Sequence, residues 1–265
     1  MTAVSKDSFD TAAAEMKDGR VAIVTGGADG FGKSFSHALL KKKAKGLCIA
    51  DFNETTGNKT LRELAEEFGE DRVMFVKCDV TSQSEFEDVF KKTKAKFGCI
   101  NLVVNNAGIM NEDNWEKCVD TNLKGTMRGT KLAIRYMGPE EGGEGGMVIN
   151  VASMAGLQAA SFMPTYTATK FASVGWTRAL QADPCLKAIG ITFGALCPAF
   201  ANTAIIDGIA RLNSDVHRDI ATALLQHMGL LEVDEVTDSF LRLVLDKFWE
   251  GKVLGLTKLN GIVQV

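Results

Sequence analysis

The stretch VAIVTGGADGFG, residues 21–32, joins an apolar run to a turn that contains four glycines, with those at positions 26, 30 and 32 spaced along it. A short apolar run that ends in a glycine-rich turn is typical of a buried parallel strand, and residues 31–39 continue at helical spacing. Glycine lets the backbone approach a pyrophosphate closely, and a helix N-terminus offers free N–H groups to phosphate. We therefore predict a dinucleotide site here, although a turn can be glycine-rich for steric reasons alone. Its expected residues are Gly26, Asp29, Gly30, Phe31 and Gly32.

The alternation of strand and helix patterns continues along the chain. Further apolar runs predict strands at residues 47–50, 73–76, 100–104, 147–151, 191–196 and 253–256. Helical patterns separate them, including one from about residue 122 to 137 and one over 165–182. This order predicts an α/β single-domain Rossmann fold, a doubly wound seven-stranded parallel sheet with helices on both faces. We expect residues 20–265 to form that domain and residues 1–19 to form a polar arm outside its core.

Asp51 stands at the end of the second predicted strand, 19 residues beyond Gly32. A carboxylate at this place can accept hydrogen bonds from an adenosine ribose, and the alternative is a helix N-cap or a solvated loop acid. The carboxylate repels a 2′-phosphate, Asp29 adds negative charge, and Phe52 rather than an arginine follows. We therefore expect NAD rather than NADP, with Asp51 and Phe52 among the cofactor-binding residues.

Tyr166 and Lys170 stand four residues apart in a predicted helix, and Ser153 lies thirteen residues before Tyr166. Residues four apart share one helix face. An ammonium beside a phenol favours the phenolate, and it should lower the tyrosine pKa from about 10 toward the range that a general base needs. On its own, the pair is more often an exposed lysine beside a half-buried tyrosine. Together with the glycine-rich turn, it indicates a general base.

Taken together, these motifs resemble those of the short-chain dehydrogenase/reductase family, from residue 21 to about residue 253. Asn122, Ser153, Tyr166 and Lys170 are similar to the family's catalytic tetrad. The resemblance implies hydride transfer between an NAD cofactor and an alcohol or carbonyl, with Tyr166 as the general base. It implies that Lys170 stabilises the phenolate and holds the nicotinamide ribose. It also implies that Ser153 hydrogen-bonds the substrate oxygen and that Asn122 holds a water in a proton relay.

The resemblance also implies further cofactor-binding positions. Asp79 resembles the acid that binds adenine, and residues 105–108, Asn-Asn-Ala-Gly, resemble the segment that steadies the central strand. Pro198 is expected near the nicotinamide, and Thr203 is expected to hold its carboxamide. The remaining cofactor-binding residues expected on this basis are Cys78, Val80, Asn105, Ala107, Gly108, Phe200, Tyr166 and Lys170.

Four short stretches indicate a narrower resemblance, to one NAD-dependent branch of the family. They are residues 78–80, 114–117, 142–146 and 202–205. Three positions depart from the pattern. Ala199 stands where the family usually has glycine, and Ala152 replaces a common serine. Met163 stands where that branch has a glutamine that contacts the substrate.

The residues expected around the substrate are apolar, which favours a hydrophobic alcohol or ketone over a sugar or a hydroxy acid. Terpenoid, fatty, eicosanoid and steroid alcohols are all compatible. For the methionine-rich segment past residue 210, ordinary core packing is the alternative. The expected substrate contacts are Ser153, Tyr166, Met110, Leu157, Met163 and Phe200. Further candidates for the pocket wall are Met154, Ile205, Ile206, Ile209, Leu224, Leu225 and Met228.

The bulk composition argues against several other classes of protein. A net charge of −3 provides no basic field for nucleic acid. No run approaches the ~20 apolar residues that span a bilayer, and no signal-peptide core fits among the charges of residues 1–20. The six cysteines show no metal spacing and the three histidines are scattered. We therefore expect no metal site and a cytoplasmic protein with reduced thiols.

Two functions without catalysis stay open: an idle protein that binds a lipid-like ligand, and a structural protein with the same fold. A carrier does not require Tyr166 and Lys170 together, which favours the enzyme. We also expect a homodimer, or a tetramer that contains it, built on the helices over about 122–137 and 166–182. The second helix supports this with small and apolar residues that should not face water. These residues are Ala168, Phe171, Ala172, Gly175, Trp176 and Ala179.

Overall fold

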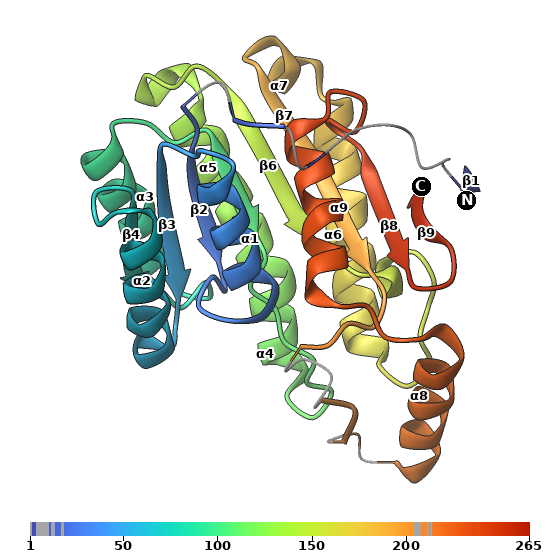
Figure 1. Ribbon diagram of the computed structural model, residues 1–265. Helices are drawn as coiled ribbons and strands as arrows, with labels where there is room; N and C mark the ends of the chain where they lie inside the picture. The colour runs from blue at the N-terminus through green and yellow to red at the C-terminus, as the bar shows by residue number, and fades with distance from the viewer. Residues whose placement is uncertain are drawn as a thin grey trace.

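The structure is a computed structural model that describes residues 2–3, 11, 14–16, 19–203, 208–210, 212 and 214–265. Its strands form one sheet, with helices on both faces (Figure 1). The strands are β1 (Thr2–Ala3), β2 (Val21–Thr25), β3 (Gly46–Asp51), β4 (Val73–Lys77), β5 (Leu102–Asn105), β6 (Gly146–Val151), β7 (Ile191–Pro198), β8 (Val253–Thr257) and β9 (Gly261–Gln264).

The helices alternate with these strands, as the sequence predicted. The α-helices are α1 (Gly30–Lys41), α2 (Glu54–Phe68), α3 (Gln83–Phe97), α4 (Trp115–Val119), α5 (Thr126–Met137), α6 (Pro164–Ala182), α7 (Pro184–Ala188), α8 (Asp215–Met228) and α9 (Val233–Leu245). A π-helical turn, η1 (Asp120–Gly125), joins α4 to α5. The short 3₁₀ helices include η2 (Pro139–Glu141) and η3 (Met154–Gly156).

The predicted α/β Rossmann fold with its seven parallel strands is confirmed. Strands β2 to β8 pair in parallel in the order β4-β3-β2-β5-β6-β7-β8. The structure adds two antiparallel strands that the sequence analysis did not predict, β9 beside β8 and β1 beside β9. Both strands are short, with β1 at the sheet edge and β9 next to it, and so few residues carry too little apolar periodicity to be recognised in the sequence.

Alternate residues of the central strands face opposite layers of helices. Ala22 and Val24 of β2 pack in the cluster that holds Phe35 of α1 and Phe240 of α9. Ile23 points the other way, into the cluster formed with α3 and α5. Because successive side chains of a strand point to opposite faces, a run that is apolar at every position is buried on both sides.

The order of the strands places a crevice at the carboxyl ends of β2 and β5. From β2 the chain moves through β3 to β4 on one side, and it then returns to β5 on the other side of β2. Ligands of doubly wound sheets bind outside the carboxyl ends of the strands at such a reversal. The glycine-rich turn and residues 105–108 follow these two strands directly.

Two boundaries differ from the prediction. The helix expected from about residue 122 begins earlier, at Trp115, because Asn114 caps it by accepting a hydrogen bond from the N–H of Lys117. The arm expected outside the core contributes to the domain at two points. Met16 is buried in the core cluster and donates its N–H to the carbonyl of Lys42, and β1 pairs with β9.

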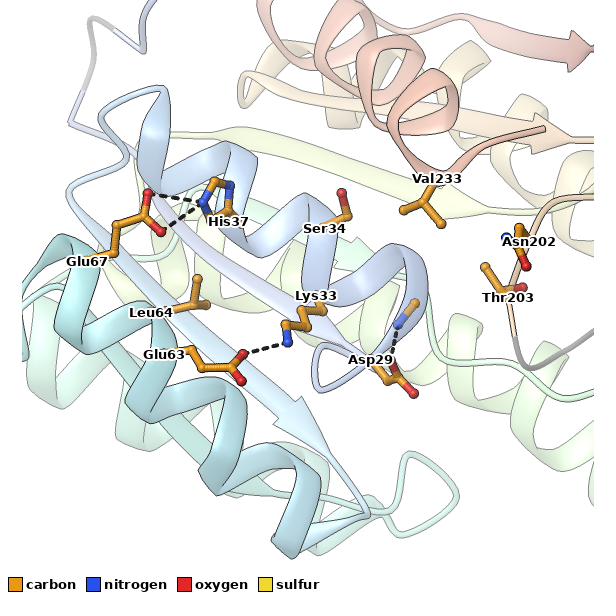
Figure 2. Close-up of a pocket in the computed structure, with 11 residues that line it drawn as sticks. Asp29, Lys33, Ser34, His37, Glu63, Leu64, Glu67, Asn202, Thr203 and Val233 are labelled. Atoms are coloured by element: carbon orange, nitrogen blue, oxygen red, sulfur yellow. Dashed lines mark hydrogen bonds and ion pairs between the residues drawn. The ribbon is translucent and has the colours of Figure 1, made fainter.

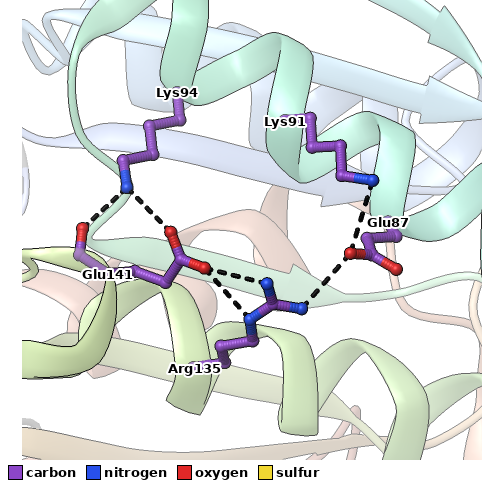
Figure 3. Close-up of polar contacts among 5 residues, drawn as sticks. All are labelled: Glu87, Lys91, Lys94, Arg135 and Glu141. Atoms are coloured by element: carbon purple, nitrogen blue, oxygen red, sulfur yellow. Dashed lines mark hydrogen bonds and ion pairs between the residues drawn. The ribbon is translucent and has the colours of Figure 1, made fainter.

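An ion-pair network ties α3 to α5 and η2 on the outer surface (Figure 3). Glu141 of η2 accepts hydrogen bonds from Lys94 of α3 and from both Nε and Nη2 of Arg135 on α5. The same guanidinium reaches Glu87, which also pairs with Lys91. Within the part of the chain that the structure describes, no helix is both long enough and apolar enough to cross a membrane.

Candidate active site

The glycine-rich turn between β2 and α1 has room only for glycine at critical points. Gly26 and Gly30 have φ values of +60° and +53°, in the left-handed region that favours glycine. At Gly32, an added Cβ would lie 2.0 Å from the carbonyl oxygen of Gly26. Asp29 caps the helix through a 2.8 Å hydrogen bond from the N–H of Gly30. The turn therefore presents a helix N-terminus with closely approachable backbone, as a pyrophosphate requires.

Asn106 locks this turn to the end of β5. Its side-chain amide donates to the carbonyls of Thr25 and Gly26, at 2.9 and 3.2 Å. The Thr25 hydroxyl in turn accepts the N–H groups of Asn106 and Ala107. The sequence analysis chose Asn105 as the cofactor residue, and the structure corrects this. The buried Asn105 side chain donates to Thr130 and Asn150 in the core.

Asp51 links the second strand to the glycine-rich turn. Its Oδ2 accepts the N–H of Ala28 at 3.1 Å, and its Oδ1 accepts the N–H of Asn53 at 2.9 Å. The alternative role expected for Asp51 was a helix N-cap, but Asn53 is the N-cap of α2. Each carboxylate oxygen keeps a second lone pair, so the group can still accept hydrogen bonds from a ribose. Phe52 beside it is 73% exposed.

The next strand end supplies the residues expected around adenine. Cys78 and Val80 are buried, and Val80 packs where Gly125 leaves room for it. Asp79 is exposed, and its Oδ1 accepts the N–H of Thr81 at 2.9 Å. Only Asp79 of this group therefore offers a solvent-facing side chain, while the other two support it from the core.

Ser153, Tyr166 and Lys170 meet at the carboxyl ends of β6 and β7. Ser153 caps η3, accepting the N–H of Ala155 at 3.1 Å, and its hydroxyl donates to the carbonyl of Pro198 at 3.4 Å. Lys170 lies 4% exposed with Nζ donating to the carbonyl of Val151 at 2.8 Å. Its Nζ is 5.4 Å from the centre of the Tyr166 ring. The spacing of four residues therefore does place the two side chains side by side.

The pKa of Tyr166 is not lowered as the sequence analysis expected. Burial raises the pKa of the phenol to about 12, and the hydrogen bond with Ser153 opposes this increase. Burial also lowers the pKa of Lys170 to about 8, because an ammonium loses its hydration there. Removal from water is therefore the largest cause of both pKa shifts. At neutral pH the structure favours a protonated Tyr166 beside a mostly protonated Lys170.

Asn122 lies in the π-helical turn η1, and a π turn inside an α-helix often marks a functional site. Both ends of its amide bind the backbone of Ile109, each at 2.8 Å. The same Nδ2 is 3.3 Å from the hydroxyl of Thr169. A Cβ added at Gly108 would lie 3.4 Å from the Asn122 oxygen and 3.6 Å from Lys170 Nζ. Gly108 therefore keeps the space between these two tetrad residues open.

A cavity of about 360 Å³ extends from the glycine-rich turn past the tetrad. Its cofactor end is lined by the expected Gly26, Asp29, Gly30, Phe31, Ala107, Gly108, Pro198, Phe200 and Thr203, and by Asn106. Its far end is lined by Met110, Met154, Met163, Ile209, Leu224 and Met228, all of which were expected, and by Gln158 and Phe162, which were not. Ser153, Tyr166 and Lys170 line the same cavity.

Two expected pocket residues lie elsewhere. Leu157 packs against the core cluster around Val174 and Cys197, because the turn after η3 directs it beneath α6. Leu225 follows Leu224 on α8 and therefore faces a different side of that helix. Ile205 and Ile206 lie outside the residues that the structure describes. Gln158 could not be predicted from the sequence because it belongs to an irregular loop without periodicity.

A second hollow, of about 720 Å³, runs along the outer side of α1 (Figure 2). Two contacts between α1 and α2 border it, the ion pair of Lys33 with Glu63 and the hydrogen bond between His37 and Glu67. Lys33 is paired there with the Glu63 carboxylate, and the described lining also carries Asp29 and Glu67, so it does not favour an anion. Among the described residues, no group of three histidine, cysteine or acidic side chains could hold a metal ion.

Comparison of the sequence with known proteins finds enzymes among its relatives. The family profile described as short chain dehydrogenase covers residues 20–211. Human 15-hydroxyprostaglandin dehydrogenase (NAD+) is 36% identical over 249 residues, 92% of this chain and 93% of its own. The 3beta-hydroxysteroid dehydrogenase 2 of Eggerthella lenta is 39% identical over 71% of this chain and 73% of its own. The narrower resemblance expected from the four short stretches was to 15-hydroxyprostaglandin dehydrogenase, and it is confirmed.

Solved structures give the same result. A short-chain dehydrogenase/reductase from Burkholderia phymatum, in complex with NAD, superposes with a TM-score of 0.73 and 26% identity, over 85% of this chain and 86% of that one. Levodione reductase superposes with a TM-score of 0.78 over 90% of this chain and 96% of its own, but at 24% identity it supports the fold alone. The chain therefore belongs to the short-chain dehydrogenase/reductase family and is a dehydrogenase that acts on hydroxyl or carbonyl substrates.

Proposed function

We propose that this protein oxidises a hydrophobic secondary or allylic alcohol to its carbonyl with NAD+, and catalyses the reverse reduction. The observation that carries the proposal is the position of Ser153, Tyr166 and Lys170. They line a single cavity together with residues of the glycine-rich turn and with Met110, Met154, Met163 and Met228. A proton-transfer group therefore shares one cavity with a dinucleotide cradle and an apolar substrate compartment.

The residues present fit an NAD cofactor. Gly26 and Gly30 have positive φ values, and a Cβ at Gly32 would collide with the Gly26 carbonyl, so glycine at these positions permits the tight turn that brings backbone close to a pyrophosphate. Asp51 and the exposed Phe52 provide a carboxylate and no cation where a 2′-phosphate would need one. The NAD-dependent relative and the NAD-bound structure support the same choice. The cofactor supplies the hydride acceptor for the oxidation and the hydride donor for the reduction.

Tyr166 is the proposed group that moves the substrate proton. In oxidation its oxygen accepts the proton of the alcohol, while the Ser153 hydroxyl bonds the oxygen that becomes the carbonyl. Because burial keeps Tyr166 protonated at neutral pH, the resting site is prepared to donate a proton to a carbonyl. Oxidation should therefore accelerate as the pH rises and reduction as it falls.

Lys170 and Asn122 are proposed to support this proton transfer. Lys170 Nζ keeps two donors beyond its bond to Val151, which can bind a ribose hydroxyl and a water. The open space at Gly108 separates it from the Asn122 oxygen. A water in that space would connect Lys170 to Asn122 and would complete the relay expected from the family.

The substrate compartment favours a hydrophobic alcohol. Its far end presents methionine, leucine and phenylalanine side chains, with the amide of Gln158 at the exposed rim. The relatives are named for prostaglandin and steroid substrates, both of which are largely apolar molecules with secondary hydroxyls. Met163 lies buried in this wall. It cannot donate or accept a strong hydrogen bond, so the substrate hydroxyl must depend on Ser153 and Tyr166.

The proposal is tested by following NADH absorbance over a panel of steroid, terpenoid, fatty and eicosanoid alcohols, with sugar alcohols and short hydroxy acids as controls. We expect NADH formation with at least one hydrophobic class and none above background with the polar controls. Turnover of the polar controls alone, or of no alcohol while NADH still binds, would contradict the proposal. The second result would favour an idle binding protein.

A further inference from the structure

The segment from Ile109 to Glu112 connects two residues of the tetrad. At its start, the backbone N–H and carbonyl of Ile109 are both bonded to the Asn122 side chain. At its end, Glu112 reaches the beginning of α6, where Oε1 accepts the N–H of Tyr166 at 2.9 Å and Oε2 accepts the N–H of Thr165 at 3.0 Å. Met110 lies between the two attachments and lines the substrate cavity.

The first turn of α6 depends on Glu112 for its backbone hydrogen bonds. The N-terminal N–H groups of a helix have no partner within the helix. Met163, the N-cap residue, provides no side-chain acceptor, and Pro164 has no N–H. The N–H of Thr167 is the first to find a partner in its own turn, the carbonyl of Met163. The N–H groups of Thr165 and Tyr166 lie between Pro164 and Thr167, and Glu112 accepts both of them.

A carboxylate suits this position physically. It accepts two N–H groups with its two oxygens, and charge-assisted hydrogen bonds are stronger than neutral ones. Its negative charge also lies at the positive end of the helix dipole. Glu112 and Tyr166 are 54 residues apart in the sequence, so this contact fixes the helix start to a segment that packs against Asn122.

We propose that Glu112 is a positioning residue for the alcohol oxidation proposed above. By holding the first turn of α6, it sets the position of the Tyr166 phenol relative to Ser153 and the substrate oxygen. Through Ile109, the same segment is joined to Asn122, so that Met110 moves together with the two tetrad residues. This inference rests on the proposed function, because positioning has a kinetic meaning only if Tyr166 transfers the proton.

The first test compares Glu112→Ala, Glu112→Gln and the control Glu116→Ala. Glu116 is an exposed acid four residues further along, on α4. We expect Glu112→Ala to lower kcat about 10-fold to 100-fold, because a displacement of the reacting group near 1 Å costs about that much. Glu112→Gln keeps one acceptor oxygen and should lie between Glu112→Ala and the wild type. The Kd for NADH should stay within about two-fold for all three.

The second test measures hydrogen exchange at the backbone amides of Thr165 and Tyr166, which needs no substrate. Glu112→Ala should accelerate exchange at both amides, while Glu116→Ala leaves them unchanged. Unchanged exchange, or accelerated exchange with wild-type kcat, would overturn the positioning role. Loss of NADH binding together with kcat would also overturn it, because it indicates general damage to the fold. An inactive wild-type protein would instead contradict the proposed function. Hydrogen exchange would then test only the contact between Glu112 and the first turn of α6.

A double-mutant cycle shows whether Glu112 acts through Tyr166. In the Tyr166→Phe background the proton acceptor is absent, so Glu112→Ala should lower the residual rate by less than about two-fold. An additive loss, as large as in the wild-type background, would show that Glu112 acts elsewhere, because independent sites add.

Discussion

At the scale of single residues, burial decides the chemistry of the tetrad. Sequence spacing correctly placed Lys170 beside Tyr166, because residues four apart share a helix face. It could not supply the sign of the tyrosine pKa shift, since desolvation depends on everything that covers the side chain. The sequence does contain a signal that Asn105 faces the core and does not bind the cofactor. Val103 packs on the α3 and α5 side of β5, and Asn105, two residues on, must face the same side.

The buried charge of Lys170 should cost stability in a pH-dependent way. Its pKa falls from 10.5 to about 8, which corresponds to about 3 kcal/mol in favour of the neutral form. Between these two values the unfolded chain binds more protons than the folded chain, so wild-type stability rises with pH. A Lys170→Met variant lacks this dependence. Its stability relative to wild type should therefore be greatest at neutral pH and should decline by up to about 3 kcal/mol toward pH 10.

Urea unfolding at several pH values measures this difference. The control is Lys131→Met, which removes an exposed lysine from α5 and should give a difference that does not change with pH. If the difference in unfolding free energy between Lys170→Met and wild type were also independent of pH, Lys170 would not be buried as a charged group.

Cofactor choice should depend on the end of β3. The structure favours changing Phe52 rather than Asp51, because Asp51 also accepts the N–H of Ala28 in the glycine-rich turn. Phe52→Arg adds a cation at an exposed position where a 2′-phosphate would lie. We expect it to raise kcat/KM with NADP about 10-fold and to change kcat/KM with NAD little, since a charge-assisted hydrogen bond is worth roughly 1.5–3 kcal/mol.

Phe52→Gln is the matched control and should not improve the use of NADP. Asp51→Ala combined with Phe52→Arg should narrow the gap between the two cofactors further. A wild-type protein with equal kcat/KM for NAD and NADP would contradict the proposed preference at once.

At the scale of secondary structure elements, periodic segments were predictable and irregular ones were not. The parallel strands and the two long helices beside the site follow apolar patterns that a short window of sequence contains. The π turn at Asn122 and the first turn of α6 do not, because their side-chain contacts reach Ile109, 13 residues away, and Glu112, 54 residues away. The strand β9 was not predicted for a different reason: it has only four residues.

The ion-pair network of Figure 3 should stabilise the packing of α3 on α5 in a charge-dependent way. Hydrogen bonds from Lys94, and then from Arg135, hold the pKa of Glu141 below its usual 4.5. A lowered carboxyl pKa contributes stability above the unfolded value, and this contribution is lost as the pH falls through the folded value. Glu141→Gln should therefore lower the urea midpoint at neutral pH, and the difference should narrow below about pH 4.5.

Added salt should also reduce the difference in urea midpoint between Glu141→Gln and wild type, because salt screens exposed charges. Glu140→Gln, a change at the exposed neighbouring acid, is the control and should leave the midpoint unchanged. A Glu141→Gln difference that persisted undiminished in acid would mean that the network contributes nothing through its charge.

At the scale of the whole molecule, the outer face of α6 indicates self-association. Phe171 on this face is 43% exposed, and no atom lies within 4 Å of a Cβ built at Gly175. Trp176 has a buried indole Nε1 with no hydrogen-bond partner among the described residues. The described part of this chain therefore does not cover Phe171 and Gly175. We propose that a second copy does, forming a homodimer or a tetramer that contains it.

Ala172→Glu should break the proposed dimer, because it places an unpaired charge in the contact. Sedimentation equilibrium at micromolar concentration should find about twice the chain mass of 28.6 kDa, or a multiple of it, for wild type and a monomer for the variant. Thr55→Glu, an exposed change in the first turn of α2, is the control and should leave the assembly intact. A wild-type monomer would end the dimer proposal.

The central claim is that Tyr166 transfers the substrate proton during NAD-dependent alcohol oxidation. The most direct measurement is kcat for the best alcohol of the panel, for wild type and Tyr166→Phe, together with NADH binding by each. The change removes the phenol oxygen alone, so kcat should fall by at least ~10²-fold while the Kd for NADH stays within about two-fold. Retention of more than about a tenth of the wild-type kcat would contradict the claim.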